Sequence, residues 1–98
     1  MAAYTLRSKV YVYPGMAAWR FLTVPKKESE AIRNKYGAHA RGWGSLPITV
    51  SVGKTTWNTS IFPDTKSGTY LLPLKAAVRK MEGIDDEDTV SFSITLRA

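Results

Sequence analysis

Residues that could do chemistry are sparse in this sequence, and the familiar motifs among them are incomplete. Gly53-Lys54-Thr55 has the tail of a phosphate-binding loop. That loop needs a further glycine where Ile48 stands, and a helix where the pattern that follows indicates a strand. Gly42-Trp43-Gly44 lacks the third glycine of a dinucleotide fingerprint, because Pro47 takes its place. Neither motif predicts a nucleotide site.

The other candidates for catalysis or metal binding lack partners. His39 is the only histidine and there is no cysteine, which excludes a thiolate site or a pair of histidine ligands within one chain. The acidic run 85–88 lacks the alternation and the distal glutamate of a calcium loop. Ser60 lacks the glycines of a nucleophile elbow, and Lys75 has no identifiable partner for Schiff-base chemistry. We therefore predict no catalytic residue, no metal and no cofactor.

Three tryptophans are an excess for a chain of 98 residues. Trp19 and Trp57 stand in stretches typical of strands, which places them in the predicted core. Trp43 instead stands in a loop between two glycines, beside Arg41 and His39. Its ring could stack on a ligand or cover one end of the fold. The sequence leaves both alternatives open.

Basic side chains outnumber acidic ones by 14 to 8, which gives a net charge of +6. The excess is uneven, because residues 1–81 hold 13 of the basic and 3 of the acidic side chains. Lys75, Arg79 and Lys80 gather on one predicted helix. Such charges either form a solvated surface that keeps a small domain soluble or form a face that binds polyanions.

The elements that position these residues follow from hydrophobic periodicity. Alternation with a period of two predicts strands, and apolar residues three and four apart predict helices. The expected strands cover 4–13, 18–24, 46–52, 55–62, 70–72 and 90–96, with a turn at Pro14-Gly15. The expected helices cover 25–36 and 73–82. The apolar face of the second helix would consist of Leu74, Ala77, Val78 and Met81.

These elements predict a mainly β fold. Five to six strands joined by short loops favour a small closed antiparallel barrel with two short helices at its ends, since closure removes exposed sheet edges. We expect one domain over residues 1–98, closed by one chain and therefore a monomer. Without cysteine, a leader segment or a membrane span, the sequence is typical of a soluble cytoplasmic protein.

Two stretches are more specific than this general pattern, namely 57–63 (WNTSIFP) and 68–80 (GTYLLPLKAAVRK). Together with 19–25 and the Arg41-Gly42-Trp43-Gly44 loop, they resemble the bacterial family of unknown function DUF1905. The resemblance covers about residues 4–96. It implies a double-split β-barrel, sometimes beside a second domain linked by name to bacteriocin protection. Because the activity of that family is not established, the resemblance implies no catalytic residues.

A second resemblance concerns the C-terminal part of the chain. Residues 72–84 followed by 88–90 are similar to the strand, proline, helix, acidic turn and strand of AbrB and MazE type DNA-binding proteins. Those proteins are dimers that close one barrel with two chains. Glu87 stands where a glycine usually precedes the aspartate of the turn. A shared fold alone does not imply DNA binding.

Because site chemistry is absent, we expect a non-catalytic binding or interaction module for an acidic ligand or protein partner. Its predicted binding residues are Arg41, Trp43, Lys75, Arg79 and Lys80. The alternative is AbrB-like nucleic-acid binding through the basic face of the second helix. A third hypothesis is an enzyme acting on a small acidic metabolite, with Ser60, Thr59 or His39 taking part.

Overall fold

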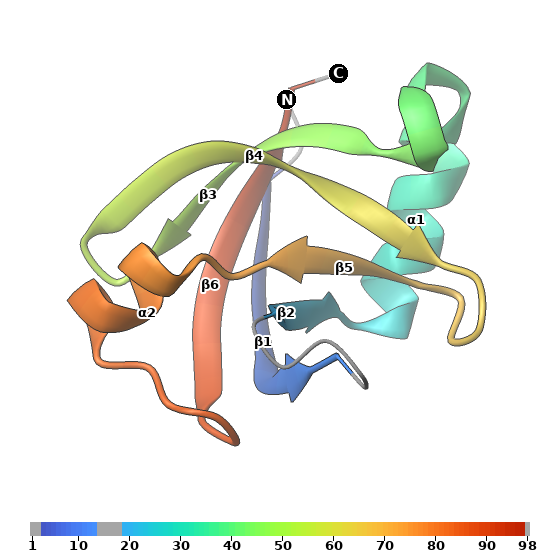
Figure 1. Cartoon of the computed structure of the whole chain (residues 1–98). Helices are drawn as coiled ribbons and strands as arrows, with labels where there is room; N and C mark the ends of the chain where they lie inside the picture. Colours follow the sequence, from blue (N-terminus) through green and yellow to red (C-terminus); the bar gives the residue numbers. More distant parts are fainter. Residues whose placement is uncertain (1–2, 14–18, 98) are drawn as a thin grey trace.

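A computed structural model describes residues 3–13 and 19–97, and it forms a closed barrel of six strands with two short helices (Figure 1). The order around the barrel is β1-β2-β5-β4-β3-β6, and every neighbouring pair is antiparallel. The strands are β1 (Ala3–Val12), β2 (Arg20–Val24), β3 (Leu46–Val52), β4 (Thr55–Asp64), β5 (Thr69–Pro73) and β6 (Thr89–Leu96). The helices are α1 (Lys26–Tyr36) and α2 (Ala76–Glu82). The predicted mainly β barrel is confirmed, and one chain closes it.

The barrel consists of two sheets that share two long strands. β1 pairs with β6 over residues 3–9 and then with β2 over residues 10–12. β4 likewise pairs with β3 over residues 55–61 and with β5 over residues 62–64. One sheet therefore holds β1, β6, β3 and β4, and the other holds β1, β2, β5 and β4. The predicted turn at Pro14-Gly15 lies outside the described residues.

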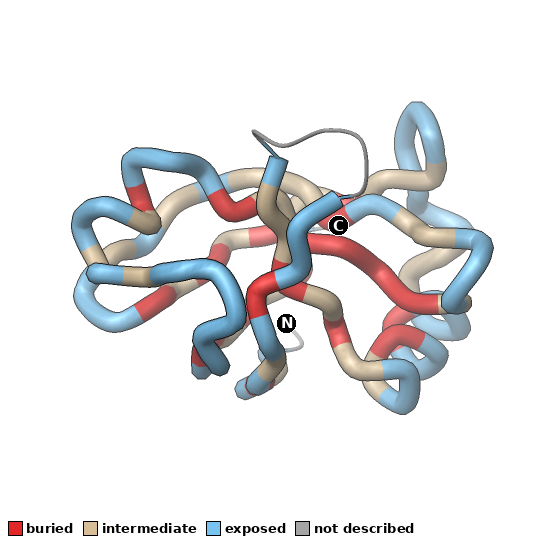
Figure 2. The backbone as a smooth tube through the Cα atoms, turned by 60° about the horizontal axis from the view of Figure 1, so that its bottom comes forward, coloured by how far each residue is buried: buried red, intermediate tan, exposed pale blue. Residues whose placement is uncertain are grey.

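The core fills the space between the two sheets, and the alternation seen in the sequence supplies it. Residues 46, 48, 50 and 52 of β3 are all buried, and so are residues 90, 92, 94 and 96 of the neighbouring strand β6, on the same face of the sheet. Figure 2 shows buried residues along the strands and exposed residues along most of the helices and loops. With no cysteine in the chain, this apolar packing carries the fold.

Helix α1 begins directly after Pro25, as predicted, and inserts the fully buried Ile32 into the core. Ser29 on the same helix is also fully buried. Its hydroxyl donates to the carbonyl of Val24 at 2.9 Å and accepts from the amide of Tyr70 at 3.0 Å. Val24 and Tyr70 are partners at the end of the β2–β5 ladder. The Ser29 hydroxyl therefore joins the helix to that ladder.

Helix α2 is shorter than predicted, because Pro73 ends β5 instead of opening the helix. The backbone amide of Leu74 still bonds to the carbonyl of Arg20, which extends the strand and delays the helix to Ala76. The predicted apolar face is correct for Leu74 and Val78, which are buried. It is wrong for Ala77 and Met81, since Ala77 is exposed and Met81 is 70% exposed. Seven residues make too few turns to bury a longer stripe.

Two features fix the C-terminal end of α2. Gly83 closes the helix in the left-handed conformation with φ 64°, as the sequence predicted. Glu82 accepts a hydrogen bond of 2.6 Å from the Thr55 hydroxyl and lies against Gly53 in the β3–β4 turn.

In the loop after α2, Glu87 has φ 75°. The position therefore has the backbone conformation that glycine adopts most easily.

Candidate binding surface

The outer faces of the two sheets differ in chemistry. Outward side chains of β3 and β4 are polar and bond to one another, with Thr49 donating to Asn58 at 2.7 Å and Ser51 and Thr56 sharing a hydrogen bond of 2.8 Å. The other sheet is apolar on its outer side. In its register, Tyr11 lies opposite Phe21 and Phe21 opposite Pro73. An antiparallel sheet normally has a polar outer face, so an apolar one marks a candidate interaction site.

These outward side chains form an open hollow of about 370 Å³ on the outer face of the β1-β2-β5-β4 sheet. We call this hollow the aromatic groove. Leu71 is buried but stands outside the core cluster, because it faces outward as the floor of the groove. Phe62 lies opposite Leu71 in the β4–β5 ladder. The lining residues are Tyr13, Trp19, Phe21, Phe62, Leu71 and Pro73.

The rings on one side of the groove support each other. Trp19 stacks on Phe21 with ring centroids 6.0 Å apart, and Tyr13 meets the edge of Phe21 at 5.7 Å. Tyr11 continues the row, 6.2 Å from Tyr13. Such ring pairs contribute about 0.5–1.5 kcal/mol beyond the area they bury. The wall is therefore held in place before any ligand arrives.

Two further hollows adjoin the aromatic groove. The first has a volume of about 270 Å³, shares Trp19 and Pro73 with the groove, and is lined by Arg20, Lys75 and Arg79 among others. We call it the cationic hollow. The second, of about 140 Å³, shares Tyr13 with the groove and is lined also by Tyr11, Asp64 and Lys66. Because neighbouring hollows share lining residues, the three hollows lie in a row from the β4–β5 loop to α2, and we call this row the track.

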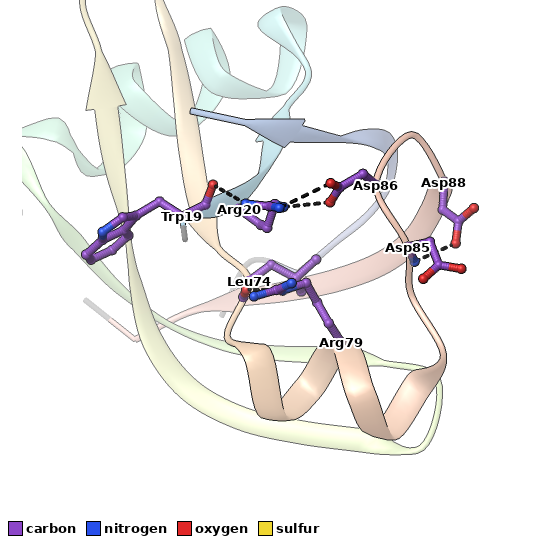
Figure 3. Close-up of polar contacts among 7 residues, drawn as sticks. All are labelled: Trp19, Arg20, Leu74, Arg79, Asp85, Asp86 and Asp88. Carbon is purple, nitrogen blue, oxygen red and sulfur yellow. Dashed lines mark hydrogen bonds and ion pairs between the residues drawn. The ribbon is translucent and has the colours of Figure 1, made fainter. Parts of the chain in front are cut away.

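An ion pair orders the side of the cationic hollow (Figure 3). Arg20 donates from Nε and Nη2 to the two carboxylate oxygens of Asp86, at 2.6 and 3.1 Å. The hydrogen bond from Arg20 lowers the pKa of Asp86, and the nearby charges of Arg20 and Arg79 act in the same direction. Figure 3 shows the Trp19 indole on the opposite side of Arg20 from Asp86. The loop after α2 is thereby tied to β2.

The structure separates the five residues that the sequence singled out for binding. Lys75 and Arg79 line the cationic hollow, and Arg79 bonds to the carbonyl of Leu74 at 3.2 Å. Lys80 is exposed and lines a neighbouring shallow hollow with Arg79. Arg41 and Trp43 belong to the loop between α1 and β3, which lies on the side of the molecule opposite α2 in Figure 1.

Trp43 is 92% exposed and therefore does not cover an end of the barrel. It occupies a short 3₁₀ turn, Gly42–Gly44, with φ 64°. A bulky residue in this left-handed conformation costs about 1–2 kcal/mol. Gly44 beside it packs so closely on Pro63 that an added Cβ would lie 2.9 Å from the ring. The turn thus presents an indole to solvent at the expense of stability.

Trp19 corrects the expectation that both strand tryptophans are core. It is 49% exposed on the outer face of the barrel. Trp57 does pack against the core cluster. The signal for the difference was present in β2, because Trp19 and Phe21 share one strand parity while Leu22 and Val24 share the other. A strand that is apolar on both faces must bury both faces or present one of them to a partner.

A hollow with a larger volume than the aromatic groove, about 650 Å³, lies between β1 and the loop after α2. Its charged groups already have partners in the chain, since Lys9 pairs with Glu87 at 3.4 Å and Asp86 pairs with Arg20. The protein itself therefore neutralises the charges that line this hollow. We regard the aromatic groove as the stronger candidate, because its apolar lining has no such internal partner among the described residues.

The residues considered for catalysis do not form a reactive group. His39 is exposed after α1, whereas Ser60 lies on β4 opposite Pro47. Thr59 shares the inward strand parity of Trp57 and Ile61. Within residues 3–13 and 19–97, no hydrogen bond joins any two of these three side chains, and no three acidic or histidine side chains gather as metal ligands do. Asn58, next to Thr59 on β4, points outward and accepts a hydrogen bond from Thr49.

No helix in the described part of the chain is long and apolar enough to cross a membrane. No curated protein matches the sequence. A family model described as a domain of unknown function, DUF1905, matches residues 7–94. The match includes every residue that lines the aromatic groove and the cationic hollow. The chain therefore belongs to the DUF1905 family.

Proposed function

We propose that this protein is a non-catalytic binding module for an anionic ligand or protein partner. The observation that carries the proposal is the continuity of the aromatic groove with the cationic hollow through the shared side chains Trp19 and Pro73. Such a surface suits a ligand with an apolar body and a negative end. Apolar contact supplies the affinity, and Lys75 and Arg79 select the charge.

The chain would act as a monomer, because its six strands close the barrel without a second copy. This arrangement differs from the two-chain barrel that AbrB and MazE type proteins build. The lack of cysteine suits a cytoplasmic setting.

Thermal shift measurements test the proposal. The panel consists of aromatic carboxylates, acidic peptides, single-stranded RNA and duplex DNA, each at low and moderate salt. A ligand at about 100 times its dissociation constant adds about 2.7 kcal/mol, which raises the melting temperature by about 10–20 °C in a domain of this size. We expect at least one anionic probe to raise the melting temperature of the natural sequence and to lose that effect in Trp19→Ala.

Trp43→Ala is the matched control, because it removes the same ring from the opposite side of the molecule. If Trp43→Ala abolished the shift and Trp19→Ala preserved it, binding would belong to the Arg41 and Trp43 loop, and the groove would be the wrong surface. The strained and exposed indole of Trp43 makes that loop the second candidate surface.

Nucleic-acid binding by α2 is the alternative function. Lys80 is exposed on this helix and Lys75 is exposed directly before it, while Arg79 donates its Nε to the carbonyl of Leu74. This alternative predicts affinity that falls steeply with salt, with a smaller slope after Lys75 and Lys80 are changed to alanine. A melting-temperature shift that persists at moderate salt would instead favour the groove.

A further inference from the structure

The shape and charge of the track indicate which class of ligand it takes. Its three hollows are open and follow one another across β1, β2, β5 and β4. Pockets for small molecules instead enclose most of the ligand surface. An elongated ligand that passes from hollow to hollow fits this track better than a compact one does.

The distribution of charge separates the two kinds of elongated polymer. Channels for single-stranded nucleic acid place cations along the whole backbone path. Here the six residues that line the aromatic groove carry no charge. Carboxylates stand at both ends, with Asp64 beside Lys66 in one end hollow and Asp86 paired with Arg20 at the other. A continuous polyanion would find no cation along the aromatic groove and would compete with these carboxylates for the cations at its ends, so the pattern favours a polypeptide.

The position of the groove on the sheet restricts the conformation of such a polypeptide. β2 pairs with β1 and β5, and β5 pairs with β2 and β4. A peptide lying on this face therefore cannot add a strand to the ladder. Polyproline II segments keep their backbone solvated and need no ladder, and grooves lined by aromatic residues are the surfaces that bind them.

We propose that the aromatic groove binds an extended, proline-containing segment of another protein and that Lys75 and Arg79 in the cationic hollow bind an acidic residue of that segment. This inference rests on the proposed binding function and specifies its partner. Apolar side chains of the segment lie between the Trp19 wall and Phe62, over Leu71. The charge of the segment sets its direction along the track.

Fluorescence anisotropy with a designed peptide tests this proposal. The probe is a labelled peptide of prolines and one leucine with two glutamates at one end, prepared in both orientations, and its counterpart has lysines in place of the glutamates. We expect the acidic peptide to bind about tenfold more tightly than the basic one. Trp19→Ala should weaken binding by about tenfold or more, as removal of an aromatic anchor does. The melting temperature confirms that this variant folds.

Charge reversal gives the sharper test. In Lys75→Glu the new carboxylate offsets the charge of Arg79, so the preference for the acidic peptide over the basic one should be lost. Lys54→Glu is the matched control, because it makes the same change in the exposed β3–β4 turn and should leave the preference unaltered. A preference unaffected by Lys75→Glu, or peptide binding unaffected by Trp19→Ala, would overturn the proposal.

Two other probes separate this inference from the proposed function. Suppose that the peptides do not bind, while an aromatic carboxylate such as naphthoate binds and its binding depends on Trp19. The groove then binds small molecules, and only the inference of a peptide partner is refuted. If a single-stranded thymidine oligonucleotide binds more tightly than the acidic peptide, the partner is nucleic acid and the inference also falls. If no probe of any class depends on Trp19, the proposed function falls as well.

Discussion

Replacing Ser29 by alanine should destabilise the protein far more than the loss of one hydroxyl on a helix ordinarily does. Ser29 is fully buried and carries two hydrogen bonds, one to the Val24 carbonyl and one from the Tyr70 amide. Alanine would leave both backbone groups buried without this partner. Each such group costs about 1–3 kcal/mol. At about 1.5 kcal/mol for each of the two groups the cost is about 3 kcal/mol, and the better helix propensity of alanine returns only about 0.5 kcal/mol, so we expect a net loss of about 2–3 kcal/mol.

Urea denaturation followed by tryptophan fluorescence measures this loss. For a domain of this length, it corresponds to a melting temperature lower by about 10–20 °C. Ser91→Ala is the matched control, because Ser91 is exposed on the outer face of β6. That change should stay within about 0.5 kcal/mol of the natural sequence.

Hydrogen exchange should locate the effect. Amides of β2 and β5 should lose protection in Ser29→Ala before those of β3 and β4 do, because the hydroxyl extends the β2–β5 ladder. If Ser29→Ala were as stable as Ser91→Ala, the two hydrogen bonds of Ser29 would contribute nothing to the free energy of unfolding. The conclusion that α1 stabilises β2 and β5 through Ser29 would then be wrong.

Three other changes test the loops. The first change is in pH. Arg20 holds the pKa of Asp86 below its ordinary value of 3.8. The ion pair therefore stabilises the fold fully above pH 3.8, and this stabilisation is lost as the pH falls through the lowered pKa of the folded state. Unfolding curves for the natural chain and Asp86→Asn should therefore differ at pH 7 and converge in acid. Gly53→Ala should cost about 1–3 kcal/mol in thermal unfolding, since φ is +56° and the new Cβ would collide with the Glu82 carboxylate. Glu87→Gly should gain about 0.5–1 kcal/mol in the same assay by relieving a positive φ, and a loss there would contradict the strain.

The sequence predicts most of this fold because alternation reports burial directly. β3 and β6 have an apolar residue at every second position, and each of those residues is buried as expected. The start of α2 could not be read in the same way. Proline suits both the first turn of a helix and the end of a strand, and only the bond from Leu74 to Arg20 shows that Pro73 ends the strand.

The candidate site was harder to predict because it depends on which strands become neighbours. Phe21, Phe62 and Pro73 are distant in the sequence and share one face only through the registers of β2, β5 and β4. Lys75 and Arg79 were singled out by charge alone, and the fold places them next to Trp19. No local pattern brings a strand tryptophan to a helix that begins more than fifty residues later.

The uneven charge of the chain gains a physical meaning from this arrangement. The acidic segment after α2 lies beside the cationic hollow, and its Asp86 forms an ion pair with Arg20. The cations that remain for a ligand are then concentrated at Lys75 and Arg79 instead of forming a broad positive face. On the proposed function, a net charge of +6 with such local neutralisation would select a ligand with one negative group beside an apolar part. Removing the acidic partner with Asp86→Asn should therefore broaden binding toward polyanions, although the groove itself is unchanged.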